Sequence, residues 1–321
     1  MIAGPILVTG ASGFIGSHLA RRLAEAGAEV TGLASASGAA ARLAGMPVNF
    51  TAAHADLRDP EALRRLFGAT PFRAVFHLAA HGVRQEADGG LATVETNTLA
   101  SFALARAALD FKVERFVYCG SGFEYLPQDA PIPESTPVGS HTLYGASKAA
   151  GWLLLDYLRR MEDLPLVTVR PFTVYGPAEA DSKLVPYVIR CALRGQPMKL
   201  TAGTQVRDYV YVSDVVRALV LAAEKGSPGD VYNVGSGPQG ARTVRSIVEQ
   251  AVEIAGGAAS LCNFGEATRA RTDPPVLVSD PTLARTRLGW NPQVSFEEGL
   301  RLTADWYRSE WYKEMSLPKN S

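Results

Sequence analysis

One stretch near the N-terminus constrains the fold more than any other, the run Ile6-Leu-Val-Thr-Gly-Ala-Ser-Gly-Phe-Ile-Gly-Ser-His18. Its apolar opening is long enough for a buried strand and too short for a helix. Gly10, Gly13 and Gly16 follow at three-residue spacing, and a helical pattern begins at Phe14. Such glycines permit a tight turn, close approach of the backbone to a pyrophosphate and close helix packing, while the helix N-terminus offers N–H groups and positive potential. Strand, glycine turn and helix together predict a dinucleotide-binding unit.

Composition narrows the class of protein. Of the 321 residues 47% are hydrophobic and 20% charged, the ordinary balance of a globular chain with a sizeable core. The 32 basic residues equal the 32 acidic ones, so the charge predicts no nucleic-acid or membrane partner. Three scattered cysteines fit neither a disulfide framework nor a zinc site, and the histidines form no ligand cluster, so we expect no metal. Because no signal peptide and no run of roughly 20 apolar residues is evident, we expect a cytoplasmic protein.

Strands and helices alternate over the first half of the chain. The predicted strands lie at residues 29–33, 48–51, 74–78, 115–118 and 166–169, with helices near 60–67, 90–109 and 142–162. This alternation predicts parallel strands joined by right-handed crossovers, a Rossmann-type doubly wound sheet. Later elements are shorter, with helices near 182–194, 213–224, 243–255 and 295–309. We expect a dinucleotide-binding domain over 1–176, a smaller C-terminal α/β substrate-binding region over 177–315, from which Val231–Val234 is a candidate to rejoin the main sheet, and a tail at 316–321.

The end of the second strand bears on the choice of cofactor. A fold that binds NAD usually carries an acidic residue about 20 residues beyond the glycines, which binds the ribose hydroxyl. The run Thr31-Gly-Leu-Ala-Ser-Ala-Ser37 has no Asp or Glu, so a 2′-phosphate meets no charge repulsion there and can bond to Ser35 or Ser37. Arg42 either pairs with this phosphate or is a solvated helix residue. These residues favour NADP(H), with NAD(H) as the alternative.

Asp56 follows the third predicted strand and offers a carboxylate to the adenine amino group. The competing role, capping the helix before Pro60, belongs more naturally to Asp59. We therefore include Asp56 and its neighbour Leu57 in the predicted cofactor site.

A tyrosine and a lysine four residues apart mark the predicted chemistry. Tyr144-Gly-Ala-Ser-Lys148 places a phenol and an ammonium on one face of a helix. A nearby cation favours phenolate and lowers a tyrosine pKa from about 10 toward working pH, which makes Tyr144 a usable general acid or base for an alcohol or ketone. Such pairs occur by chance on exposed helices. Here the glycine turn and Ser121, at the carboxyl end of a predicted strand, support a site, because ligands bind at that end of parallel strands.

In these residues the sequence resembles the extended short-chain dehydrogenase/reductases that act on nucleotide sugars. The matching motifs run in order along nearly the whole chain: Thr9-Gly-Ala-Ser-Gly-Phe-Ile-Gly16, His77-Leu-Ala-Ala80, Asn97, Ser121 four residues before Tyr125, Tyr144-x-x-x-Lys148, Arg170-Pro-Phe-Thr-Val-Tyr-Gly-Pro177, Arg207-Asp-Tyr-Val-Tyr-Val-Ser-Asp214, Tyr232-Asn-Val-Gly235 and Leu288-Gly-Trp-Asn-Pro292. Each motif is modest, but the ordered set is specific. The resemblance implies that Ser121 hydrogen-bonds the reacting oxygen, Tyr144 exchanges its proton and Lys148 contacts the nicotinamide ribose.

The resemblance also implies the outline of the cofactor site. Ala79 and Ala80 would line the cofactor, and Pro171 and Val174 would flank its nicotinamide end. The complete predicted cofactor-binding set is Gly10, Gly13, Phe14, Ile15, Gly16, Ser35, Ser37, Arg42, Asp56, Leu57, Ala79, Ala80, Asn97, Pro171 and Val174.

Departures from the family pattern help to choose a reaction. Dehydratases of this type carry an acidic pair, and the related decarboxylases a Glu, directly after the Ser or Thr. Here those positions are Gly122 and Phe123, so we expect neither reaction. Glu124 is shifted by one residue and, if the segment is strand-like, would point the other way. Thr173 stands where many relatives have an Asn that contacts the nucleotide diphosphate, and its hydroxyl is a substitute for that contact.

Further side chains are candidates for the substrate. Arg207 and Arg271 suit a diphosphate, because a guanidinium matches phosphate oxygens in bidentate fashion; the alternative is a surface arginine. Arg269 competes with Arg271, since residues 269–273 do not align cleanly with the family pattern. Lys183 reaches either the nucleotide or solvent, and His81 borders the sugar pocket. The predicted substrate-binding set is His81, Phe123, Thr173, Lys183, Arg207 and Arg271.

The helix that carries Tyr144 is apolar nearly all round, through Leu153, Leu154, Leu155, Tyr157 and Leu158. Its outer face needs cover, either from a partner subunit in a symmetric bundle with the helix near 97–109 or from the same chain. The resemblance implies a homodimer.

Three functions follow from these observations. A nucleoside-diphosphate-sugar 4-ketoreductase would pass hydride from NADPH to a C4 carbonyl, while Tyr144 donates a proton and Ser121 steadies the alkoxide. A 4-epimerase would oxidise C4, rotate the keto intermediate and return the hydride to its other face. The missing acidic residue after the second strand favours the ketoreductase, because epimerases of the family usually retain NAD. The third function is that of a non-catalytic dinucleotide-binding protein. The presence of Ser121, Tyr144 and Lys148 argues against it.

Overall fold

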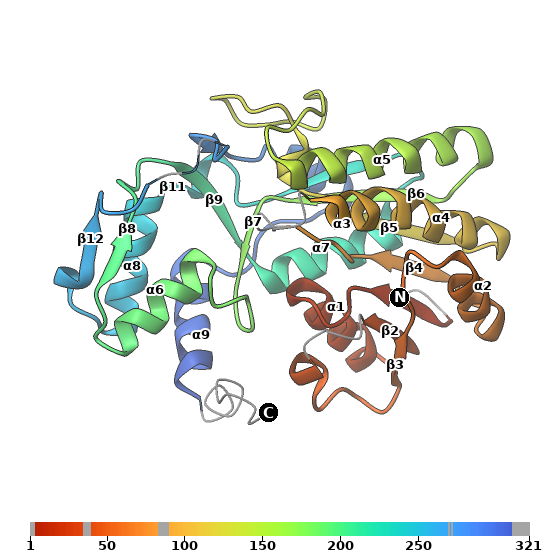
Figure 1. The fold of residues 1–321 in the computed structure, drawn as a ribbon, viewed down its shortest axis with the longest axis horizontal. Helices are drawn as coiled ribbons and strands as arrows, with labels where there is room; N and C mark the ends of the chain where they lie inside the picture. The colour runs from red at the N-terminus through yellow and green to blue at the C-terminus, as the bar shows by residue number, and fades with distance from the viewer. Residues whose placement is uncertain (1–3, 35–39, 83–89, 269, 271, 310–321) are drawn as a thin grey trace.

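The computed structural model describes residues 4–34, 40–82, 90–268, 270 and 272–309 (Figure 1). Its centre is a seven-stranded sheet of order β10-β6-β5-β4-β1-β2-β3, in which all neighbours are parallel. The strands are β1 (Ile6–Thr9), β2 (Val30–Ala34), β3 (Phe50–His54), β4 (Ala74–His77), β5 (Arg115–Cys119), β6 (Leu166–Pro171) and β10 (Val231–Val234). The predicted doubly wound parallel sheet is confirmed, and β10 joins it at the edge beside β6.

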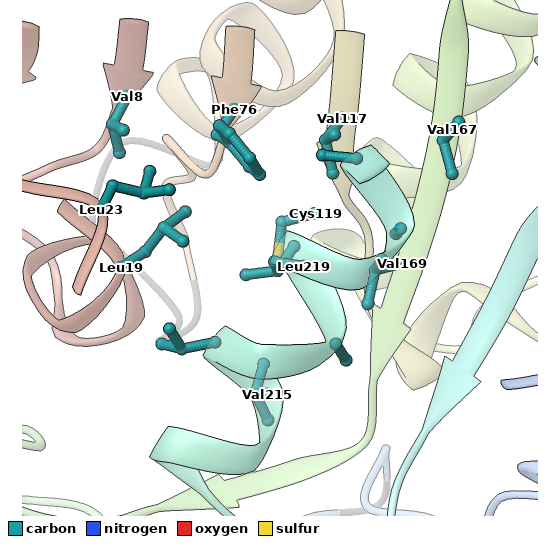
Figure 2. Packing of buried hydrophobic residues seen from close by; sticks show 14 of the residues in the cluster. Val8, Leu19, Leu23, Phe76, Val117, Cys119, Val167, Val169, Val215 and Leu219 are labelled. Carbon is teal, nitrogen blue, oxygen red and sulfur yellow. The ribbon is translucent and has the colours of Figure 1, made fainter. Parts of the chain in front are cut away.

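Helices cover both faces of this sheet, because alternate strand residues point to opposite sides. On one face Val8 and Phe76 meet Leu19 and Leu219 of two helices, as Figure 2 shows. Leu7 and its counterparts in the neighbouring strands face the other layer. The first layer is α1 (Phe14–Glu25) and α7 (Val212–Lys225), and the second is α2 (Pro60–Ala69), α4 (Ala100–Asp110) and α5 (Leu143–Glu162). Strands buried on both faces explain the continuous apolar runs of the sequence.

Local sequence signals decide where several helices begin. Asp59 caps α2 by accepting from the backbone N–H groups of Glu61 and Ala62, with Pro60 as the first helical residue. The Thr142 hydroxyl caps α5 by accepting from the Gly145 N–H. The helix predicted over 90–109 is interrupted: α3 (Leu91–Val94) leads through a π-helical turn, η2 (Glu95–Leu99), into α4.

A smaller region lies beside the main sheet (Figure 1). Its strands are β7 (Thr173–Tyr175), β9 (Val206–Tyr211), β11 (Ala241–Thr243) and β13 (Val276–Leu277), with β8 (Met198–Leu200) paired to β12 (Cys262–Phe264). Its helices α6 (Leu184–Leu193), α8 (Val244–Ala255) and α9 (Phe296–Arg308) share one apolar cluster. Single turns complete the described chain: η1 (Ala40–Leu43), η3 (Gly122–Glu124), η4 (Pro238–Gly240), η5 (Ala259–Leu261) and η6 (Ala284–Leu288). No helix in the described ranges is long and apolar enough to cross a membrane.

Candidate active site

The glycine turn joins β1 to α1, and its glycines are required for different reasons. Gly10 has φ +69, and a Cβ there would lie 2.7 Å from the backbone nitrogen of Ala79. Gly13 caps α1 without a side chain, which leaves the first N–H groups of the helix open to an anion. A Cβ on Gly16 would lie 2.8 Å from the Gly10 carbonyl carbon and closer still to its oxygen. The turn therefore brings β1, α1 and the segment after β4 into contact.

The other predicted cofactor residues surround this turn. Phe14 and Ile15 open α1 half-buried, and Ala79 donates its N–H to the Thr9 hydroxyl at 3.3 Å. Ala80 is exposed beside it. Pro171 ends β6, buried, and Val174 on β7 is half-buried where the two sheets meet.

Of the two alternatives for Arg42, the structure disagrees with a solvated helix residue. It lies half-buried in η1, and its guanidinium donates to the carbonyl oxygens of Ser12 (3.3 Å) and Ala178 (2.9 Å). It therefore bridges the glycine turn to the segment that follows β7. Ser35 and Ser37 lie outside the described residues.

Asp56 lies on the surface and accepts from both the backbone and the guanidinium of Arg58. This hydrogen bonding lowers the pKa of Asp56. Leu57 beside it packs partly buried against the α2–α4 layer. Asp59, and not Asp56, caps α2, as predicted.

Ser121, Tyr144 and Lys148 meet at the carboxyl end of β5. Ser121 caps η3 directly after β5, and its hydroxyl accepts from the Phe123 N–H at 3.2 Å. The Tyr144 phenol lies near the Ser121 side chain, which lowers the pKa of the phenol. The buried Lys148 ammonium donates to the Cys119 carbonyl at 2.7 Å and lies 4.1 Å from the centre of the Tyr118 ring.

The expectation that Lys148 lowers the pKa of Tyr144 is corrected. Burial raises the pKa of Tyr144 above its ordinary value, and Cys119 and Glu124 raise it further, while the Ser121 side chain opposes them. The ammonium points to a backbone carbonyl and a neighbouring ring, so its attraction does not outweigh desolvation. The phenol is therefore protonated at neutral pH, the form that donates a proton.

A directed chain of hydrogen bonds, missed by the sequence analysis, runs behind the site. Ser101 donates to the Asn97 carbonyl (2.8 Å), so its oxygen must accept from His77 Nε2 (2.8 Å). His77 Nδ1 then accepts from the Thr9 hydroxyl (2.7 Å), which accepts from Ala79 N–H. These bonds fix neutral His77 in the tautomer protonated at Nε2 and connect the glycine turn to the π-helical turn.

The Asn97 side chain is bonded within the protein. Its buried amide bonds to both backbone groups of His81 and donates to the Ser147 hydroxyl at 2.9 Å, and Ser147 in turn donates to the Tyr144 carbonyl. A Cβ on Gly151 would overlap the Asn97 carbonyl oxygen, so this glycine lets α5 approach. Asn97 thus braces α5 from behind, and its contribution to the cofactor site stays a prediction.

His77 gives a testable pH dependence. Burial, reinforced by the Lys148 charge, lowers its pKa from 6.5 to about 3, so the unfolded chain binds the proton first. The resulting loss of stability begins as the pH falls below about 6.5 and grows by about 1.4 kcal/mol per pH unit toward pH 3. We expect the difference in unfolding free energy between wild type and His77→Gln, measured in urea, to shrink by roughly 2 kcal/mol between pH 6 and 4.5. A difference that stays constant with pH would contradict the neutral, buried His77.

Of the predicted substrate residues in the described ranges, Phe123 lines a hollow next to the site. Phe123 lines it together with Thr142 at the start of α5 and with Thr272 and Leu277 of the smaller region. Thr173 lies on β7 opposite Tyr209 of β9, half-buried.

The charged substrate candidates lie in different elements of the smaller region. Arg207 is buried in β9, where its guanidinium pairs with Asp273 and donates to the carbonyls of Val206 and Pro274. Lys183 precedes α6 at the N-cap position. Arg271 and its competitor Arg269 lie outside the described residues.

A parallel sheet with a glycine turn after β1 and polar side chains gathered after β5 defines a Rossmann-type dinucleotide-binding protein. The sequence profile of the NAD dependent epimerase/dehydratase family matches residues 6–235. The chain belongs to this family, within the extended short-chain dehydrogenase/reductase group.

Relatives in this family agree along nearly the whole chain. A UDP-glucose 4-epimerase of Mycolicibacterium smegmatis is 33% identical, covering 95% of this chain and 98% of the relative. A dTDP-glucose 4,6-dehydratase of Escherichia coli is 30% identical, covering 95% and 92%. The crystal structure of the Thermus thermophilus UDP-glucose 4-epimerase in complex with NAD superposes with a TM-score of 0.86 at 32% identity, covering 95% of this chain and 99% of the other.

Proposed function

We propose that this protein is a nicotinamide-dependent oxidoreductase acting at C4 of a nucleoside-diphosphate sugar. The observation that carries the proposal is the meeting of Ser121, Tyr144 and Lys148 after β5, at the same edge of the parallel sheet as the glycine turn after β1. Tyr144 would exchange a proton with the C4 oxygen, Ser121 would hydrogen-bond that oxygen, and Lys148 would hold the nicotinamide ribose. The cofactor would supply or accept the hydride.

Elimination of water is not part of the proposal, although dehydratases are among the relatives. The two positions after Ser121 are Gly122 and Phe123, and neither carries an acid. Gly122 packs so closely against Phe172 that an added Cβ would lie 2.8 Å from its ring. The next acid, Glu124, faces the interior and pairs with Arg170.

Two forms of C4 chemistry each have support. Reduction of a 4-keto, and in particular a 4-keto-6-deoxy, sugar by NADPH is supported by the absence of an acid in the sequence after β2. Epimerisation at C4 with bound NAD is supported by the two epimerases described above, one of which was solved with NAD. The N-terminus of α1 would hold the pyrophosphate of the cofactor, and Arg42, which donates to the Ser12 carbonyl in the glycine turn, would contact the adenosine end.

One assay separates these forms. The protein is incubated with nucleoside-diphospho-4-keto-6-deoxy sugars and either NADPH or NADH, and with UDP-glucose without added cofactor. Stoichiometric loss of absorbance of the reduced cofactor supports the reductase, and preference for NADPH supports the 2′-phosphate site. Interconversion of C4 epimers without net cofactor use supports the epimerase. No turnover of either substrate class, together with no cofactor binding, refutes the proposal.

We also propose a homodimer, as the resemblance implied. Leu155 and Leu158 of α5 are buried within the chain, but Leu153 and Met161 are exposed on its outer face, with Leu99 on the neighbouring turn. A symmetric helix bundle would cover these side chains. We expect Leu153→Glu to halve the mass measured by light scattering, and a monomeric wild type would rule the dimer out.

A further inference from the structure

A buried ion pair lies directly behind Ser121. Glu124 and Arg170 are both almost completely inaccessible to solvent, and Glu124 Oε2 lies 2.6 Å from Arg170 Nε. The other carboxylate oxygen, Oε1, accepts from the Ser121 N–H at 2.8 Å. A single carboxylate therefore connects the backbone of Ser121 to a fixed guanidinium.

The guanidinium is held on several sides. It lies between the rings of Tyr125 and Trp152, with its central carbon 4.6 and 4.5 Å from their centres. Its Nη1 donates to the Tyr125 hydroxyl at 2.9 Å, and that hydroxyl donates to Asn233 Oδ1 on β10 at 2.8 Å. Arg170 is therefore tied to α5 through Trp152 and to the edge strand of the sheet.

The Glu124–Arg170 ion pair holds the backbone of Ser121 in place. Glu124 completes a reciprocal cap: Ser121 Oγ accepts from Phe123 N–H while Glu124 accepts from Ser121 N–H. With its backbone and its hydroxyl oxygen both fixed, Ser121 can direct its own O–H proton toward the Tyr144 phenol beside it or toward a bound substrate. Gly120 makes room, since an added Cβ would overlap Glu124 Oε1.

A buried pair is a poor source of stability compared with apolar packing, so its presence here calls for another explanation. We propose that Glu124, anchored by Arg170, is a positioning residue that aims the Ser121 hydroxyl at the reacting oxygen of the substrate. The inference rests on the proposed C4 chemistry, and it holds for reductase and epimerase alike, because both would use Ser121 in the same way.

A double-mutant cycle with Ser121→Ala tests this inference. Glu124→Gln keeps an acceptor of the same shape but loses the charge that fixes it to Arg170. In the presence of Ser121 we expect kcat to fall about 30-fold with KM changed less than about threefold; in the Ser121→Ala protein the same substitution should change kcat less than about threefold. Equal factors in the two backgrounds, or an unchanged kcat with Ser121 present, would overturn the inference.

Two further variants keep the test decisive. Glu134→Gln is the matched control: Glu134 is a partly buried carboxylate that, like Glu124, accepts from a backbone N–H, here that of Asn233 at 2.8 Å, but it does not contact Ser121. It should leave kcat unchanged in both backgrounds. If Glu124→Gln does not fold, the cycle is repeated with Glu124→Gln/Arg170→Met, which leaves no unpaired buried cation.

A measurement without substrate separates this inference from the proposed function. Hydrogen exchange at the Ser121 amide should be about tenfold faster in Glu124→Gln than in wild type and unchanged in Glu134→Gln, with wild-type protection in the preceding strand β5. Unchanged exchange at Ser121 would overturn the positioning role even if no turnover were found. Absence of turnover in wild type, with the exchange result as expected, would instead refute the C4 chemistry alone.

Discussion

Replacement of Tyr144 with Phe is expected to lower kcat about a thousandfold, since a positioned general acid or base contributes on the order of 10²–10⁴ in rate. The ring and its packing on α5 are retained, so only the phenolic hydroxyl, which would carry the transferred proton, is lost. We expect the affinity for the reduced cofactor, measured by quenching of its fluorescence, to change less than about twofold, because the proposed ribose contact belongs to Lys148.

Tyr187→Phe is the matched control for this experiment. Tyr187 lies on α6, outside the predicted site, and its loss of a hydroxyl should leave kcat at the wild-type value. A Tyr144→Phe protein that retains more than a tenth of wild-type kcat would show that another group moves the proton.

Gly16→Ala is expected to cost about 3 kcal/mol of unfolding free energy, at the upper end for overpacking, and to abolish cofactor binding. The new methyl group would overlap the Gly10 carbonyl, which is backbone and cannot move aside as a flexible side chain can. Relief requires α1 to move away from the turn, and this takes its N-terminal N–H groups away from the pyrophosphate. Urea unfolding and cofactor fluorescence measure the two effects.

Gly68→Ala tests whether the cost comes from the contact and not from the substitution itself. Gly68 lies in α2, and the nearest atoms to an added Cβ are those of the Phe111 ring at 3.9 Å. Alanine there should raise the unfolding free energy by about 0.5–1 kcal/mol, the usual gain in a helix interior. A Gly16→Ala protein as stable as Gly68→Ala, with intact cofactor binding, would refute the packing argument.

Features that depend on residues adjacent in the chain were predicted well from the sequence. Apolar runs such as Ile6-Leu7-Val8 identified the strands of the main sheet, and caps such as Asp59 located the helix starts, because both act within a few residues. The strands of the smaller region were missed. They are two to six residues long, and their pairing, for example of β7 with β9, joins segments far apart in the chain.

The same distinction between local and long-range features applies to the candidate site. The glycine spacing and the Tyr144–Lys148 spacing were visible as local patterns. Three other features were not visible in the sequence: the bonding of Asn97, the direction of the hydrogen bonds through His77, and the ion-pair partner of Glu124. Each of these contacts joins different elements of the fold. The raised pKa of Tyr144 was also beyond sequence reasoning, since desolvation depends on everything packed around the phenol.

The sequence by itself determined the family, the parallel sheet, the glycine turn and the residues proposed to exchange the proton, since these follow from short-range patterns in a fixed order. Only the tertiary structure decided that Lys148 turns to a backbone carbonyl, that Asn97 braces α5, and that Glu124 faces Arg170 behind Ser121. The physical reason is that hydrogen bonds and burial are satisfied between elements brought together by folding, and the partner of a buried polar group is not encoded by its neighbours in the chain.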